Sequence, residues 1–200
     1  YRGELFQFML NEFIDFVDSV LPSVDPDFRD GAKKAITQFE KEGHQIKYLT
    51  QNVLEQLSQG DVVSKIPFFY FDKEGKQKIF SADALVLSTS CHIDQKESII
   101  MVPVLPLEAF TGNMLELKRN TVYDYMYIPD EVMSKKFVNF QIANTYNKEL
   151  IMTGLREGRI KRIASLNQIG YYLFVVKLTV YFMRKEDEGT LEERANLAGC

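Results

Sequence analysis

The segment SADALVLSTSCHIDQKESIIMVPVLPL, residues 81–107, contains two short apolar runs that predict the central strands of a sheet. The runs are Ala84–Leu87 and Ile99–Val102, and both are short and rich in residues that favour strands. The polar link between them gathers serine, threonine, cysteine, histidine and aspartate within residues 88–94. No other stretch of the chain is as dense in nucleophile, base and acid side chains, so any chemistry is expected here first.

The residues before Gly60 predict helices. Residues 5–20 place apolar side chains at helical spacing with acids between them, which is typical of an amphipathic helix. A second helix is expected after the capping residue Asp25 and should end at Gly43. Thr50 is a plausible cap for a third, short helix. Together these segments, residues 1–59, form a predicted N-terminal helical extension.

From Gly60 the pattern changes to that of strands. Pro67 interrupts the apolar run 66–71, because a proline cannot donate to a ladder, and it predicts an edge or bulged strand. The polar turn around Gly75 predicts a hairpin with glycine in the left-handed region. Residues 107–110 are expected to form a turn of helix, residues 111–120 a surface excursion, residues 121–128 and 137–142 further strands, and residues 144–148 a turn.

The C-terminal part predicts one long helix followed by a charged tail. Residues 169–183 fit either a helix or an alternating strand, and the spacing of Ser165 and Gln168, which is that of a capping box, favours the helix. The tail, residues 185–200, is expected to be solvated or frayed. Helices, then strands, then a helix indicate an α+β fold rather than alternating βαβ units.

Composition narrows the function classes. The chain has 200 residues, nearly half of them apolar, and a net charge of -4, so a globular protein is expected and a generic nucleic-acid coat is not. No apolar run approaches the roughly 20 residues of a membrane span, and residues 5–21 do not resemble a signal peptide. Two cysteines and two histidines predict neither a disulfide framework nor a zinc site. The expectation is a cytoplasmic protein without a membrane, metal or cofactor.

Three motifs in the strand region resemble the PemK/MazF-type toxin superfamily. They are GDVV at residues 60–63, ALVLSTSCHID at residues 84–94 and MVPVLPL at residues 101–107. The longer pattern, with LSxxCxID, is similar to uncharacterised bacterial and phage proteins near that superfamily. The resemblance implies a small SH3-like barrel over residues 60–184, ending in a helix, and a toxin-antitoxin or phage-defence role. It is specific over about 50 residues.

The sequence departs from the toxins where they cleave RNA. The resemblance implies an arginine before the second strand and a threonine or serine after its VVP motif. Here those places hold Ser81–Asp83 and Leu105. A leucine can neither donate a proton nor hold a phosphate oxygen. The resemblance therefore transfers the fold more readily than the activity.

Candidate site residues fall into two groups. His92 and Asp94, two positions apart on an extended segment, can share a face, so the carboxylate could orient the imidazole as a base, with a solvated loop histidine as the alternative. Asp61 is a third candidate catalytic residue, with satisfaction of turn amides as its alternative role. Cys91 is expected to be a small buried apolar residue. The candidate RNA or anion contacts are Arg156, Arg159, Lys161, Arg162 and Arg119.

Two functions from different classes follow. The first is an RNA-directed protein, an endoribonuclease if it is an enzyme, whose basic run holds phosphates while tyrosines such as Tyr123 or Tyr125 stack on bases. The second is a non-catalytic interaction module, in which the barrel and the aromatic N-terminal helices bind a protein partner or a second copy of the chain.

Overall fold

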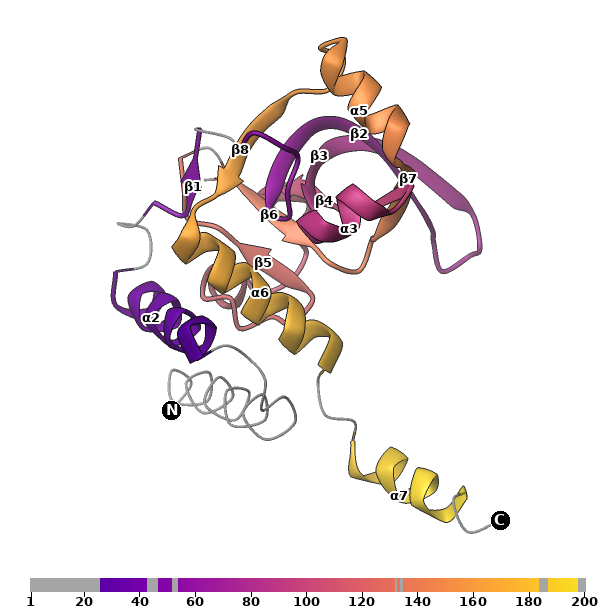
Figure 1. Ribbon diagram of the computed structural model, residues 1–200. Helices are drawn as coiled ribbons and strands as arrows, with labels where there is room; N and C mark the ends of the chain where they lie inside the picture. The colour runs from indigo at the N-terminus through magenta and orange to yellow at the C-terminus, as the bar shows by residue number, and fades with distance from the viewer. Residues whose placement is uncertain are drawn as a thin grey trace.

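The computed structural model describes residues 26–42, 47–51, 54–131, 133, 135–183 and 187–197, and its architecture is α+β (Figure 1). The strands are β1 (Leu49–Thr50), β2 (Asp61–Phe71), β3 (Gln77–Val86), β4 (Ser98–Pro106), β5 (Tyr125–Tyr127), β6 (Lys136–Asn139), β7 (Asn144–Asn147) and β8 (Arg162–Leu166). The helices are α2 (Pro26–Glu42), α3 (Ser90–Gln95), the 3-10 turn η2 (Leu107–Ala109), α4 (Met114–Lys118), α5 (Lys148–Arg156), α6 (Gln168–Met183) and α7 (Glu188–Leu197).

The eight strands form one antiparallel sheet around the two strands predicted to be central. Its order is β1-β8-β2-β3-β4-β6-β5, and β7 pairs separately with β4. β3 and β4 pair with Leu85 opposite Val102, and both side chains are fully buried. The prediction of two central buried strands is therefore confirmed, although within the run Ile99–Val102 of β4 Ile100 is exposed.

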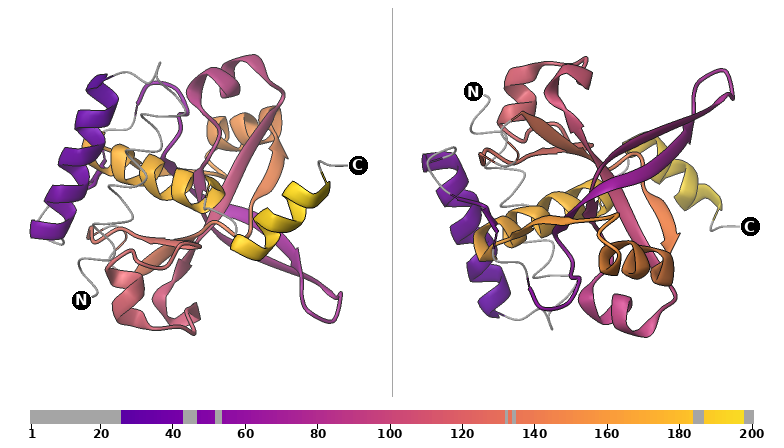
Figure 2. Two further views of the ribbon diagram at one scale, coloured as in Figure 1. Left: turned by 90° about the horizontal axis from the view of Figure 1, so that it is seen from below. Right: turned by 90° about the horizontal axis from the view of Figure 1, so that it is seen from above.

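A bulge divides β2 into two halves with different partners. Its first half pairs with β3 and β8, and the register shifts between Val63 and Ile66, where Lys65 has a φ of 60°. Beyond the bulge β2 pairs with β3 alone, which confirms the edge position predicted from Pro67. The two strands then run out as a hairpin that projects from the body (Figure 2). Gly75 in its turn has a φ of 75°, as predicted.

Side chains of β7 bridge the gap between the two ends of the curled part of the sheet. Asn144 Oδ1 accepts a hydrogen bond from Phe69 N (2.8 Å), and its Nδ2 donates to Phe69 O (3.2 Å). The hydroxyl of Tyr146 donates to Pro67 O (2.8 Å). Because β7 already pairs with β4, these bonds join β7 to β2 and complete a ring of β2, β3, β4 and β7. The sheet itself is not closed by a backbone ladder.

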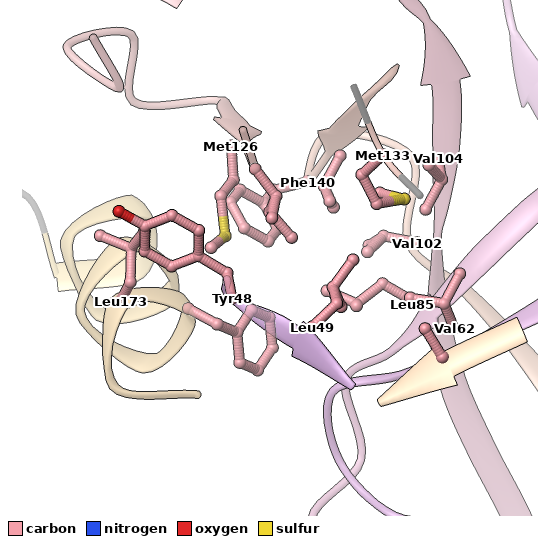
Figure 3. Close-up of a cluster of buried hydrophobic side chains, with 14 residues drawn as sticks. Tyr48, Leu49, Val62, Leu85, Val102, Val104, Met126, Met133, Phe140 and Leu173 are labelled. Carbon is pink, nitrogen blue, oxygen red and sulfur yellow. The ribbon is translucent and has the colours of Figure 1, made fainter. Parts of the chain in front are cut away.

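Two hydrophobic cores lie on the two faces of the sheet. The first lies between the sheet and α6, and Figure 3 shows Leu173 and Tyr48 facing Leu85 and Val102 across it. The second fills the curled part of the sheet beneath α3 and α5 and contains Phe68, whose ring stacks on Phe80 at 5.7 Å.

The helix α6 confirms the predicted C-terminal helix but not its predicted cap. Asn167 Oδ1 accepts a hydrogen bond from Gly170 N (3.0 Å), so Asn167 is the capping residue. Ser165 belongs to β8 and is buried. The helix is apolar on all sides because it packs on the sheet and also, near its start, beside α2, where the Tyr172 ring lies against Gly31.

Several local predictions are wrong. Thr50 belongs to a strand, because Leu49 and Thr50 pair with Leu166 and Ser165, and the described residues 54–58 form no helix. Residues 144–148 form β7 and the start of α5 rather than a turn. The excursion at residues 111–120 contains α4, whose Leu117 is buried. The tail is helical over residues 188–197 rather than frayed, but none of these residues is buried, as expected for a solvated segment.

The helix expected at residues 5–20 lies outside the described residues. The second predicted helix is confirmed over Pro26–Glu42. The division at residues 59 and 184 stays a prediction, since β1 comes from the N-terminal segment and yet adds to the sheet.

Candidate functional site

The polar link between the central strands forms a short helix and not an extended loop. Thr89 caps α3, its Oγ1 accepting a hydrogen bond from His92 N (3.3 Å). Residues two positions apart on a helix do not face each other, so the shared face predicted for His92 and Asp94 is wrong. Both side chains are exposed. Cys91 is also exposed, which contradicts its predicted burial.

Asp61 is buried at the start of β2 and all its contacts are structural. Its Oδ1 accepts from Ser165 Oγ (2.5 Å), and its Oδ2 accepts from Ser58 N (2.9 Å) and from Arg162 Nη1 (3.0 Å). One of these donors is a backbone amide, as the alternative reading of Asp61 predicted. No hydrogen bond or ion pair in the described part of the chain joins Asp61 to His92 or Asp94.

Arg162 is the partner of Asp61 and is largely buried, with 17% of its side chain exposed. Its guanidinium also donates to Gln56 O (2.8 Å) and Glu55 O (3.0 Å). These bonds hold Glu55 and Gln56 against β8, more than a hundred positions away in sequence. Two predicted site residues, one catalytic and one basic, thus form a single buried pair.

The other basic residues are exposed, and two of them pair with carboxylates nearby in sequence. Arg156 Nη2 lies 2.5 Å from Glu149 Oε1, and this guanidinium, by hydrogen bond and by charge, and Thr153 lower the pKa of Glu149. Arg159 lies 2.6 Å from Glu157. Exposed pairs of this kind contribute little, so both guanidiniums can exchange their partner for a phosphate.

The bulge of β2 adds a cation that the sequence did not reveal. Ser64 N donates to Lys161 O (2.9 Å), and Lys161 N donates to Ser64 Oγ (3.0 Å). These bonds set Lys65 beside the end of the basic run, and Lys65, Arg159 and Lys161 are all exposed. We call these three residues the basic rim. The proline at position 67 was the one sequence signal for a bulge near Lys65.

Arg119 lies elsewhere, at the end of α4, on a loop supported by a buried lysine. Lys177 Nζ donates to Asn120 O (3.0 Å) and Val122 O (2.6 Å). The Asn120 side chain in turn pairs with both backbone groups of Tyr127. Burial lowers the pKa of Lys177 to about 7, with Asp124 opposing the shift. A lysine inside an apolar helix pattern gave no sign of this role.

The places that differ from the toxins hold an ion pair and a leucine. Asp83 Oδ2 lies 2.7 Å from Lys136 Nζ, and both side chains are partly exposed. Leu105 pairs with Phe137 of β6, which packs edge to face on Phe110 and Tyr125. The Tyr125 ring is therefore half-buried rather than a free stacking surface.

No group of three or more histidine, cysteine or acidic side chains among the described residues could hold a metal ion. Among those same residues, no helix is long and apolar enough to cross a membrane.

No protein-family model matches the chain, and no curated protein matches it in sequence. One solved structure with partial similarity is the crystal structure of MazE-MazF from Deinococcus radiodurans. The two chains are 14% identical, and the similarity covers 64% of this chain and 97% of that chain with a TM-score of 0.38.

Proposed function

We propose that the chain is an RNA-directed protein of the PemK/MazF toxin-like class, built on a small SH3-like barrel. The basic rim is the observation that carries this proposal. Its three cations come from two segments about 95 positions apart, and the two hydrogen bonds between Ser64 and Lys161 bring those segments together. In a chain with a net charge of -4, such a local cluster attracts a polyanion where the overall charge does not.

Phosphate contacts are assigned to the three residues of the basic rim, Lys65, Arg159 and Lys161. Arg162 is left out because its guanidinium is committed to Asp61 and to two carbonyl groups. Cleavage, if the protein cleaves, is assigned to His92, the one histidine among the described residues, with Asp94 on the same exposed helix.

The test is binding of a fluorescent single-stranded RNA by a variant with Lys65→Gln, Arg159→Gln and Lys161→Gln. Glutamine keeps side chains of similar length, so the fold should be unaffected. The matched control replaces Lys33, Lys34 and Lys41, three exposed lysines of α2, by glutamine. We expect at least a tenfold loss of affinity for the first variant and less than threefold for the control. Equal losses in both variants would refute the rim as the binding site.

A His92→Ala variant separates binding from cleavage. The imidazole is assigned to proton transfer and not to affinity, so RNA binding should persist while any cleavage of the bound RNA stops. Cleavage by this variant at the rate of the parent would exclude His92 from the reaction.

A non-catalytic interaction module is the second candidate function. The observation that favours it is the exposed apolar surface of the β2–β3 hairpin, where Phe71 and Ile79 are 65% and 71% exposed. The aromatic N-terminal helix at residues 5–20, predicted to serve the same role, lies outside the described residues.

A further inference from the structure

We call the projecting β2–β3 hairpin, residues 65–80, the arm. One face of the arm has no element packed on it. Phe69 lies opposite Ile79, Pro67 opposite Ser81 and Phe71 opposite Gln77, so these side chains share the outer face. Phe69, Phe71 and Ile79 are 46%, 65% and 71% exposed. On the opposite face Phe68 is buried under Phe80 and Tyr146, whereas Tyr70, nearer the tip, is 40% exposed.

The helix α7 is a second element whose side chains are not covered. It is ten residues long, none of them is buried, and Figure 1 shows it extending away from the rest of the chain. A helix this short is marginal in water without a surface to pack on. Leu191 and Ala195 lie one turn apart on one side, and Leu191 is 40% exposed.

The charges of the two elements are opposite. Residues 187–197 carry four acids and one arginine, a net charge of 1 − 4 = −3, and residues 65–80 carry four lysines and two acids, a net charge of 4 − 2 = +2. Glu188 and Glu192 lie one turn apart beside the Leu191–Ala195 stripe, and like charges at that spacing repel each other. A surface that supplies both lysines and apolar side chains relieves this repulsion.

Going beyond the RNA-directed function, we propose that α7 of one chain docks on the outer face of the arm of a second copy, and the reverse, to form a reciprocal dimer. Leu191 and Ala195 pack on Phe69 and Ile79, and the lysines at the arm tip face the acids of α7. Each copy then contributes one arm and one α7, so the two contacts of the dimer are identical, as two-fold symmetry requires.

The experiment uses two charge-reversed forms of the full chain. Form one carries Lys73→Glu and Lys76→Glu in the arm, and form two carries Glu188→Lys and Glu192→Lys in α7. All four side chains are exposed, so the fold should survive in both forms. Sedimentation velocity across a concentration series gives the dimer dissociation constant, and Lys33→Glu with Lys34→Glu in α2 serves as the matched control.

The parent and the control should dimerise, and each reversed form alone should dimerise at least tenfold more weakly. An equimolar mixture of the two forms should dimerise nearly as well as the parent, because each arm then meets an α7 of opposite charge. A parent that remains monomeric at about 100 µM, a concentration typical of a protein stock, would overturn the proposal. So would reversed forms that dimerise like the parent, or a mixture that stays as monomeric as its components, which is the result expected if α7 covers the arm of its own chain.

Discussion

At the scale of single residues, Asp61 and Arg162 form a buried pair that stabilises the fold, a role that neither residue type indicates in the sequence. Removing the arginine leaves a carboxylate with no exposure and no countercharge, and breaking a buried pair in this way costs about 3 kcal/mol. Arg162→Gln should therefore lower the free energy of unfolding in urea by about that amount. Arg159→Gln, three positions earlier and exposed, should change it by less than about 0.5 kcal/mol. Equal effects of the two substitutions would show that the Asp61–Arg162 pair does not stabilise the fold.

The burial of Lys177 predicts that the stability of the fold depends on pH. Its pKa is about 7 in the folded chain and 10.5 in the unfolded chain, so between these values the unfolded chain binds more protons. Stability from this residue therefore increases as the pH rises above 7, by about 2 kcal/mol between pH 7 and pH 9. The measurement is the difference in unfolding free energy between the parent and Lys177→Met at both pH values. A difference that does not change with pH would contradict the burial of a titrating ammonium.

At the scale of elements, β4 gives a matched pair of positions for testing the core. Ile99 is fully buried in the core beneath α3, whereas the neighbouring Ile100 points outward and is 38% exposed. Ile99→Asp buries an unpaired charge, which costs several kcal/mol of a total stability of roughly 5 to 15, and should unfold the chain. Ile100→Asp should cost about 1 kcal/mol and leave a cooperative thermal transition. A folded Ile99→Asp variant would show that the face of β4 is misassigned.

The same strand shows what the sequence could and could not predict. Apolar runs identified β3 and β4 as adjacent buried strands, but the run Ile99–Val102 does not say which of its residues faces solvent. Local pattern failed at β1 and β7, which exist because of pairing partners more than 40 positions away in β8 and β4. α6 was predicted correctly through the wrong cap, since Ser165 pairs with Asp61 while Asn167 caps the helix.

The candidate site was predictable only in part, for the same reason. The basic run was visible as a cluster in sequence, yet its most buried member pairs with Asp61, about a hundred positions away. Lys65 joins the cluster only through the bulge, a feature of three-dimensional pairing. His92 and Asp94 were identified as chemically interesting, but the helical conformation of α3 separates their side chains.

At the scale of the whole molecule, the chain is acidic and the proposed RNA surface is the three-residue basic rim, so the proposed binding depends on few phosphate contacts. Three contacts predict a slope of log affinity against log salt of about -2 on a single strand, or 0.7 for each contact. Because these contacts are assigned to the rim alone, the slope should fall to near zero when the three rim cations are removed.

The most direct measurement is therefore the salt dependence of binding to a single-stranded RNA, made in parallel on the parent and on the variant with Lys65, Arg159 and Lys161 replaced by glutamine. The proposed function predicts a slope of about -2 for the parent and a nearly flat dependence for the variant. A parent that binds no RNA at moderate salt, or a variant with the slope of the parent, would contradict the assignment of RNA to the basic rim.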